Sequence, residues 1–283
     1  MSEQVPLRIA VPNKGTLSES AVEMLVEAGY KGRVDPRALV VPDERNNVEF
    51  YYLRPRDIAT YVGSGALDIG ITGRDLLLDS TSPAREVCAL DFGYSTFRFA
   101  APEAIDDIAQ LAGKRVATSY ETLVDSFLKE RGVEASIVRL DGAVESAVKL
   151  GVADAVADVV STGRTLAAQG LSIFGPVILE SEAVLISGRE NPSGLETVIQ
   201  RLQGVLVARQ YVLMDYDLPA NLLEQATAIS PGLESPTVSP LQDAEWVAVR
   251  AMVPRGDQHE VMDKLYALGA RAILVSSIHA ARI

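Results

Sequence analysis

Short apolar runs alternate with amphipathic stretches along the chain up to residue 210. The apolar runs predict strands at 7–11, 48–53, 67–71, 96–101, 115–118, 136–140, 153–160 and 182–187. The amphipathic stretches predict helices at 16–28, 57–62, 106–111, 122–131, 143–150, 164–169 and 195–209. Strands separated by helices of about ten residues are typical of βαβ units, so this part of the chain predicts an α/β body with a largely parallel sheet.

The pattern changes from Tyr211 onward. Strands are predicted at 211–216, 235–241, 245–253 and 271–277, and helices at 219–228, beginning at Pro219, and 258–268. The order β-α-β-β-α-β is the split βαβ arrangement of a ferredoxin-like module. By fold analogy alone, such a module after an α/β body indicates a regulatory domain.

Length and composition limit the class of protein. The chain has 283 residues, of which 48% are hydrophobic and 23% charged, which favours two domains or lobes with an appendage and excludes a disordered or collagen-like chain. No apolar run approaches the roughly 18 residues that span a bilayer, and the first residues do not resemble a secretory signal. A single cysteine, Cys88, excludes an internal disulfide and fits a reducing cytosol. We therefore expect a cytoplasmic protein without a membrane partner.

Charge narrows the choice of ligands. The formal net charge of −12 argues against a nucleic-acid partner, but a local loop can still hold a phosphate. The only histidines are His259 and His279, which with one cysteine argues against a His/Cys zinc site.

The window 151–166 carries the most chemistry. Asp154 and Asp158 are four residues apart in a predicted strand, so we expect both carboxylates on one face near its C-terminal end. Paired carboxylates there suit ribose hydroxyls or a bridging Mg²⁺, because both are oxygen-ligand chemistry.

A phosphate-binding turn follows these acids directly. Gly163 allows the backbone to turn closely around an anion, while backbone amides, hydroxyl groups and the helix dipole would attract it. The candidate residues are Ser161, Thr162, Gly163, Arg164 and Thr165. Acids followed by such a loop match a ribose 5-phosphate, with a diol at one end and a phosphate at the other. A purely structural arrangement, an N-capped helix after a strand with a solvent-facing Asp, gives the same pattern. The Walker and dinucleotide-binding sequence motifs are absent from this window.

This window resembles the signature of the ATP phosphoribosyltransferase family, G-x-A-D-x-I-x-D-x-V-x-T-G-x-T-L, with Val156 in place of the Ile. Further segments resemble the family in the right order, at 10–17, 56–62, 65–75 and 116–120, with Ala59 where a Pro is usual. Residues 231–238 are similar to the regulatory-domain signature of the long form. The resemblance covers essentially the whole chain.

The resemblance implies a fold and an activity. The fold is a two-lobed, periplasmic-binding-protein-like (type II) catalytic body followed by a ferredoxin-like (ACT-like) regulatory domain. Lobe I would comprise 1–90 with 178–210, lobe II 91–177, and the regulatory domain 211–283. The family joins the 5-phosphoribosyl group of 5-phosphoribosyl 1-pyrophosphate (PRPP) to N1 of ATP with Mg²⁺, in the first step of histidine biosynthesis. It further implies inhibition by histidine, AMP as a candidate ligand, and dimers that assemble into hexamers.

The resemblance also assigns roles to residues. Asp154 and Asp158 would hold the ribose or its metal, and Ser161 to Thr165 the 5-phosphate. ATP or the leaving pyrophosphate would meet Lys14, Gly73, Arg74 and Asp75, and Arg54 and Arg56 would bind ATP phosphates or form salt bridges. Asp217 would meet the ammonium of the inhibitor histidine, in a pocket lined by Leu233, Ser235, Thr237 and Ala272.

Three other classes of protein are alternatives. A two-lobed solute-binding protein would need an export signal, and the acid-and-loop window would have no purpose in it. Prephenate dehydratase would need a T-R-F segment, which is absent. Porphobilinogen deaminase would need a cysteine in a Gly/Pro-rich loop, whereas Cys88 has apolar neighbours and is expected to be buried.

Overall fold

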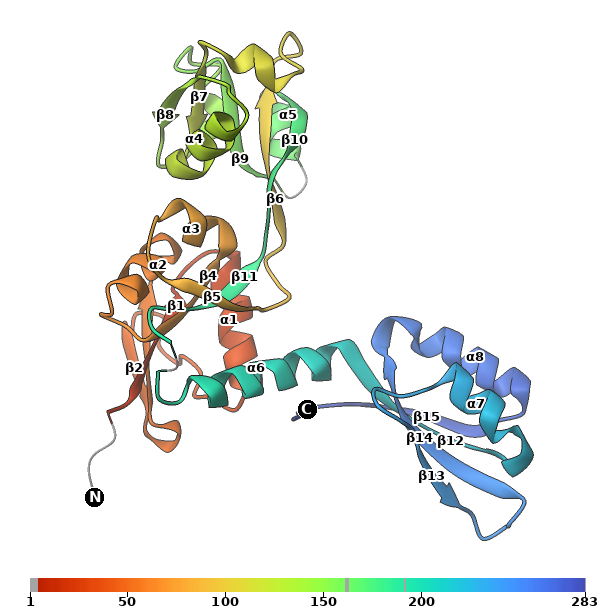
Figure 1. Ribbon diagram of the computed structural model, residues 1–283. Coiled ribbons are helices and arrows are strands. Elements are labelled where there is room, and N and C mark those ends of the chain that lie inside the picture. The colour runs from red at the N-terminus through yellow and green to blue at the C-terminus, as the bar shows by residue number, and fades with distance from the viewer. Residues whose placement is uncertain (1–4, 161–162, 191, 283) are drawn as a thin grey trace. The chain divides into compact units, whose positions relative to one another are not determined.

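The computed structural model describes residues 5–160, 163–190 and 192–282 (Figure 1). The chain divides into two compact units, Met1–Glu23 with Tyr30–Leu195, and Met24–Gly29 with Glu196–Ile283. The predicted domain boundaries differ from this division, because they assign 24–29 and 196–210 to the first catalytic lobe.

A six-stranded mixed sheet forms lobe I of the first unit, in the order β2-β3-β1-β4-β11-β5. Its strands are β1 (Leu7–Pro12), β2 (Val40–Asp43), β3 (Val48–Leu53), β4 (Ile69–Gly73), β5 (Arg85–Ala89) and β11 (Ala183–Ser187). Its helices are α1 (Thr16–Glu27), α2 (Pro55–Gly63) and α3 (Arg74–Asp79), with a 3₁₀ turn η1 (Glu44–Asn46). The central strand β1 runs parallel to β3 and β4, so these three strands end at one edge of the sheet.

A five-stranded mixed sheet forms lobe II, in the order β10-β6-β9-β7-β8. Its strands are β6 (Ser95–Ala101), β7 (Arg115–Thr118), β8 (Ser136–Arg139), β9 (Ala155–Val160) and β10 (Ser172–Ser181). Its helical segments are η2 (Ile108–Leu111), α4 (Glu121–Glu130), η3 (Val144–Ser146) and α5 (Arg164–Ala168). Successive residues of β9 enter opposite cores: Ala155 and Ala157 join the cluster around Phe99, whereas Val156 and Val160 join the other. Both faces of this sheet are therefore buried.

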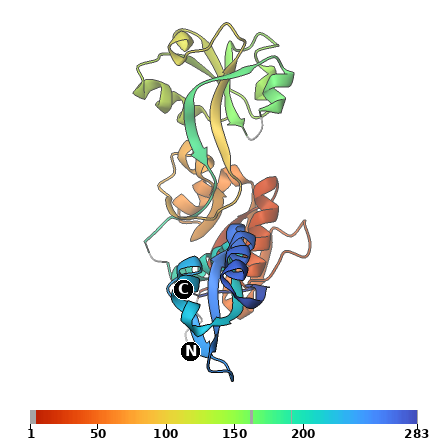
Figure 2. The same ribbon diagram turned by 90° about the vertical axis from the view of Figure 1, so that its right-hand side faces the viewer.

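Two neighbouring strands connect the lobes. β6 and β10 pair antiparallel from Ala101 opposite Ser172 to Ser95 opposite Ser181. Along the chain, β5 precedes β6 and β11 follows β10, and both β5 and β11 belong to the first sheet. Figures 1 and 2 show β6 and β10 running side by side from one sheet to the other. The predicted two-lobed body is thereby confirmed. The largely parallel sheet is wrong, because β11 is antiparallel to both its neighbours and β6 is antiparallel to β9 and β10.

The second unit ends in the predicted ferredoxin-like module. It contains α6 (Leu195–Gln210), β12 (Tyr211–Pro219), η4 (Ala220–Leu222), α7 (Leu223–Ile229), β13 (Thr237–Pro240), β14 (Trp246–Pro254), η5 (Arg255–Asp257), α8 (Gln258–Leu268) and β15 (Arg271–Ser277). The sheet order is β13-β14-β12-β15 with antiparallel pairs throughout. Alternate residues of β12, from Val212 to Leu218, pack with α7 and α8 in one apolar core.

Several strands were not predicted, because proline, glycine or charged residues interrupt their apolar pattern. β2 contains Pro42, β5 carries charge, and β10 contains Gly175 and Pro176 at an irregularity in its pairing with β6. These strands were missed for that reason, and the short helix α3 was also missed. The predicted helices at 106–111 and 143–150 contain only 3₁₀ turns, and Pro219 closes β12 instead of opening a helix.

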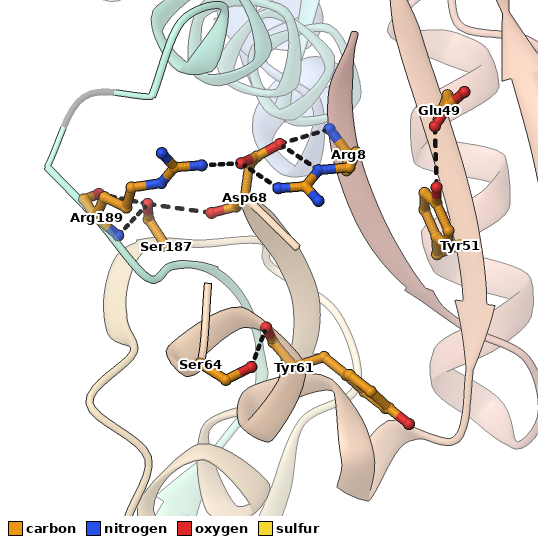
Figure 3. Close-up of polar contacts among 8 residues, drawn as sticks. All are labelled: Arg8, Glu49, Tyr51, Tyr61, Ser64, Asp68, Ser187 and Arg189. Atoms are coloured by element: carbon orange, nitrogen blue, oxygen red, sulfur yellow. Dashed lines mark hydrogen bonds and ion pairs between the residues drawn. The ribbon is translucent and has the colours of Figure 1, made fainter. Parts of the chain in front are cut away.

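An ion cluster around the buried Asp68 ties lobe I together away from its parallel strand ends (Figure 3). The Asp68 carboxylate accepts hydrogen bonds from the backbone amide of Arg8 at 2.9 Å, from its guanidinium at 3.1 and 3.2 Å, and from Arg189. Burial alone raises the pKa of Asp68, but the hydrogen bonds from Arg8 and Arg189 outweigh it and hold this pKa below its ordinary value. The ionised carboxylate thus links β1, the start of β4 and the end of β11.

Candidate active site

A cavity of about 710 Å³ lies in the first unit and is lined by residues of both lobes. Lobe I contributes residues that follow the parallel strands β1, β3 and β4, the edge at which ligands bind in α/β sheets. The lining residues are Lys14, Gly15, Thr16, Leu17, Pro55, Arg56, Gly73, Asp75, Leu76, Gly93, Tyr94, Ser95, Ser119, Tyr120, Asp158, Val159 and Ser181. Of the residues predicted for the site, the structure brings together Lys14, Gly73, Asp75 and Asp158.

Asp75 connects three parts of the cavity wall. It is 7% exposed and lies in the first turn of α3. Its backbone amide donates to the Ser181 hydroxyl at 3.0 Å, and that hydroxyl donates back to the Asp75 carboxylate at 2.9 Å. The Tyr120 hydroxyl of lobe II also hydrogen-bonds to Asp75, so this carboxylate joins α3, the connecting strand β10 and lobe II.

Gly73 leaves the room that Asp75 needs. A Cβ atom at Gly73 would lie 2.2 Å from Oδ1 of Asp75, much closer than van der Waals contact allows. The Asp75 side chain cannot move aside without losing its bonds to Ser181 and Tyr120. Glycine at this position is therefore required by the packing of the wall.

Asp158 lies on the lobe II side, in β9. Its carboxylate accepts a hydrogen bond from the Val159 amide at 2.8 Å. Burial, and then the negative charges of Glu145 and Asp75, raise the pKa of Asp158, and the bond from Val159 only partly opposes them. The ionised carboxylate would therefore be stabilised by a bound cation or by positive charge that develops on a substrate.

Two cationic side chains face the same cavity. Lys14 is exposed in the turn between β1 and α1, where Gly15 has a positive φ of 79°. The Arg56 guanidinium lies 4.9 Å from the centre of the Tyr120 ring and ion-pairs with Asp79. A cavity with both cations and carboxylates can bind phosphates and a polar, cation-bearing group together.

The structure separates Asp154 from the cavity. It precedes β9, and its carboxylate binds the guanidinium of Arg115 at 3.0 and 3.2 Å and the Arg115 amide at 2.9 Å. The hydrogen bonds from Arg115 lower the pKa of Asp154 to about 2. The prediction that one strand holds both acids is wrong, because Asp154 lies just before β9, and its carboxylate is paired with Arg115 and is not part of the cavity lining.

Arg74 is likewise engaged elsewhere. Its guanidinium donates to Glu86 at 2.8 and 2.9 Å and to Glu182 at 3.2 Å, and these bonds raise the pKa of Arg74. It is not part of the cavity lining, although its neighbours Gly73 and Asp75 are. The ion pairs fasten α3 to β5 and to the end of β10.

The predicted phosphate loop is described only in part. Ser161 and Thr162 lie outside the described residues. Gly163 precedes α5 with a positive φ of 68°, and Arg164 and Thr165 are exposed at the start of that helix. None of these last three belongs to the cavity lining, which includes Asp158 and Val159 among the described residues of this segment.

Sequence reasoning missed part of the wall. Ser181 and the turn around Tyr94 are far apart in sequence and carry no local signal, and Ser119 received no role although it lay within a family-like segment. Tyr120 lay within a family-like segment but received no role. The pairing of β6 with β10 and the contact of the two lobes are what bring these residues together.

The five residues predicted to bind histidine fall into two groups. Leu233, Ser235 and Thr237 line a cavity of about 380 Å³ in the second unit, together with residues of β14. Asp217 and Ala272 lie instead where β12 pairs with β15, with Asp217 opposite Arg271. Ala272 has a φ of 49°, an uncommon backbone conformation for a residue with a side chain.

The Cys88 thiol is half-buried in β5, where burial and then Glu86 raise its pKa to about 11. Over the described ranges, none of the helices combines the length and apolar character that a bilayer crossing requires.

Comparison with known proteins adds to this geometry. Residues 54–204 match the family model described as ATP phosphoribosyltransferase, and 208–280 match "HisG, C-terminal domain". The ATP phosphoribosyltransferases of Paenarthrobacter aurescens (strain TC1) and Arthrobacter sp. (strain FB24) are 63% identical over 287 residues and 62% over 285, covering 98% of this chain and 100% of each relative. A chain of the ATP phosphoribosyl transferase (HisG:HisZ) complex from Thermotoga maritima aligns with a TM-score of 0.61 at 25% identity, over 71% of this chain and 98% of that one. Because the family models and the relatives together span nearly its whole length, the chain belongs to the ATP phosphoribosyltransferase family.

Proposed function

We propose that the protein transfers the 5-phosphoribosyl group of PRPP to N1 of ATP, with release of pyrophosphate, in the cavity between its lobes. As a member of this family it is a glycosyltransferase acting on ATP and PRPP, and it belongs to histidine biosynthesis. The observation that carries the detailed reaction is the combination of Lys14 and Arg56 with Asp75 and Asp158 in one cavity. The cations suit phosphate groups, and the carboxylates suit the ribose or its metal.

The reaction forms one bond and breaks one. The lone pair of adenine N1 attacks C1 of the ribose, giving N1-(5-phosphoribosyl)-ATP, and the C1–O bond breaks with its electrons leaving on pyrophosphate. Positive charge develops on the ribose, where the carboxylate of Asp158 would stabilise it. Lys14 and Arg56 would bind phosphate oxygens. Adenine N1 is unprotonated at neutral pH, so positioning and charge stabilisation carry the catalysis.

Mg²⁺ fits the donors of this cavity. Carboxylate oxygens are preferred protein ligands for this ion, and Asp75 and Asp158 offer them. In the described part of the chain no three His, Cys, Asp or Glu side chains gather into a metal-binding group. We therefore assign the remaining positions to substrate phosphates and water. When bound, the ion would neutralise charge on the leaving pyrophosphate.

We assign the 5-phosphate to the segment after β9. It comprises Ser161 and Thr162, which lie outside the described residues, and Gly163, Arg164 and Thr165. The positive φ of Gly163 supports this, since it turns the backbone directly before a helix. Asp158, a few residues earlier, would then hold the ribose of the same substrate. Asp154 is left out, because Arg115 already binds it.

The second unit is proposed to bind histidine as an inhibitor. The cavity beside Leu233, Ser235 and Thr237 supports a small-molecule site there. Asp217 and Ala272, which lie where β12 pairs with β15, are also proposed to bind histidine. AMP is a further candidate ligand. A cytoplasmic homo-oligomer, from dimer to hexamer, completes the proposal, and the Thermotoga protein described as a complex supports assembly.

Pyrophosphate release tests the transfer directly. The full chain is mixed with ATP, PRPP and Mg²⁺, and pyrophosphate is measured together with the mass of the nucleotide product. We expect release only with all three components, and a product equal to ATP plus the phosphoribosyl group. Absence of release from folded protein would reject the reaction. Histidine added to the same assay should lower the rate, and a rate insensitive to histidine would reject the inhibitor site.

A further inference from the structure

A second connection between the lobes lies in α3 and α4. Asp79, the last residue of α3 in lobe I, accepts hydrogen bonds through Oδ1 from the backbone amides of Thr122 at 3.0 Å and Leu123 at 3.2 Å. These amides belong to the first turn of α4 in lobe II. Figure 1 shows α3 and α4 facing each other from the two lobes.

Helix α4 has no cap of its own. Its N-cap residue is Tyr120, whose side chain makes no capping hydrogen bond. The first amides of a helix need an acceptor, and a carboxylate there is further stabilised by the helix dipole. Asp79 supplies this acceptor from the other lobe. Its side chain is only 11% exposed, so water competes little for the same amides.

The same carboxylate also holds a cationic residue of the cavity. Its Oδ2 atom accepts a hydrogen bond from Nη1 of Arg56 at 3.0 Å. The Arg56 guanidinium in turn lies over the ring of Tyr120, the residue directly before α4. Arg56 and Tyr120 both line the cavity, whereas Asp79 itself does not.

We propose that Asp79 is a positioning residue for the transfer reaction: it holds α4 against lobe I and directs Arg56 and Tyr120 into the cavity. This rests on the proposed function. Separation of the lobes would leave the Thr122 and Leu123 amides without their acceptor and Arg56 without its partner. One partly buried carboxylate therefore favours the arrangement in which the two walls face each other.

Two substitutions separate the two contacts. Asp79→Ala removes both the helix cap and the ion pair. Asp79→Asn keeps an oxygen that can accept from the α4 amides but removes the charge that Arg56 binds. Asp125→Ala is the matched control, because it removes a carboxylate from α4 itself. Among the contacts described, Asp125 pairs only with Lys129, four residues on in the same helix, at 2.7 Å.

Hydrogen exchange of the α4 first turn is measured on the full chain without substrate. We expect faster exchange of the Thr122 and Leu123 amides in Asp79→Ala, and exchange close to that of the parent protein in Asp79→Asn and Asp125→Ala. This measurement does not depend on the transfer reaction. Unchanged exchange in Asp79→Ala would overturn the capping role even if the parent protein proved inactive.

Steady-state kinetics then separate positioning from simple stability. We expect Asp79→Ala to lose at least about tenfold in kcat/KM, with Asp79→Asn partly restoring kcat and keeping a raised KM for the substrate whose phosphates Arg56 binds. Asp125→Ala should retain the parent values. If the two Asp79 variants, shown to be folded by circular dichroism, keep parental kcat and KM, the positioning role is overturned. An inactive parent protein would instead reject the proposed function.

Discussion

Arg115 donates hydrogen bonds from both its backbone amide and its guanidinium to the carboxylate of Asp154, just before β9. Asp158, four residues further and within β9, lines the cavity instead. Two acids that look equivalent in the sequence thus have different surroundings and different expected roles.

Substituting each acid by its amide distinguishes these roles. We expect Asp158→Asn to lower kcat/KM for PRPP by about 100-fold, because the amide removes the negative charge beside the developing positive charge. Asp154→Asn should keep the parent kinetics and only weaken the link to Arg115. Initial rates at varied PRPP concentration check both. Equal losses in the two variants would contradict the assignment.

Asp158→Asn should also raise stability at neutral pH. The folded pKa of Asp158 lies above the ordinary value of an aspartate, so the ionised group favours the unfolded state once the pH rises through the range between the two pKa values. The amide has no charge to bury and escapes this cost. Melting temperatures of both proteins at pH 7 test this, and a lower melting temperature for Asp158→Asn would contradict it.

The Asp68 cluster predicts the opposite dependence on pH. The folded pKa of Asp68 lies below the ordinary value of an aspartate, so its contribution to stability is complete above that ordinary value and is lost as the pH falls through the folded pKa. Asp68→Asn should lower the free energy of unfolding by about 1–3 kcal/mol at pH 7. Denaturant unfolding at pH 7 and pH 3 checks this. A difference between the two proteins that does not shrink at pH 3 would show that the charge is not the cause.

Gly73→Ala should impair activity through Asp75. The added Cβ would lie 2.2 Å from the Asp75 carboxylate and force it away from Ser181 and Tyr120. We expect kcat/KM to fall by about 10- to 100-fold. Gly256→Ala is the control, since a Cβ there meets nothing within 4 Å and φ is not positive. Parental activity in Gly73→Ala would show that the wall can relax.

The Cys88 thiol should react slowly in the folded protein. With a pKa of about 11, on the order of one thiol in a thousand is ionised at pH 8, and the thiolate is the nucleophile. Reaction with a disulfide reagent at pH 8 should accelerate strongly when the protein is unfolded in urea. Equal rates in the folded and unfolded protein would contradict this environment.

Sequence alone determined most of the elements and the module order. Runs such as 115–118 and 271–277 became strands at the predicted bounds, because the pattern of apolar residues that favours a strand is a local property of the chain. The ferredoxin-like order was readable for the same reason. Lys14, Gly73, Asp75 and Asp158 could be predicted because each lies in a recognisable motif, the first three at or just after the end of a strand and Asp158 within β9.

Tertiary structure decided which charges are free to act. Arg74 and Asp154 belong to the same motifs, but Glu86, Glu182 and Arg115 bind them, and no local pattern predicts partners that come from other strands. Asp79 became a helix cap only because the lobes meet at α3 and α4. Hydrophobic spacing is set by neighbours along the chain, whereas the partner of a charged side chain is set by which distant segments the fold places beside it.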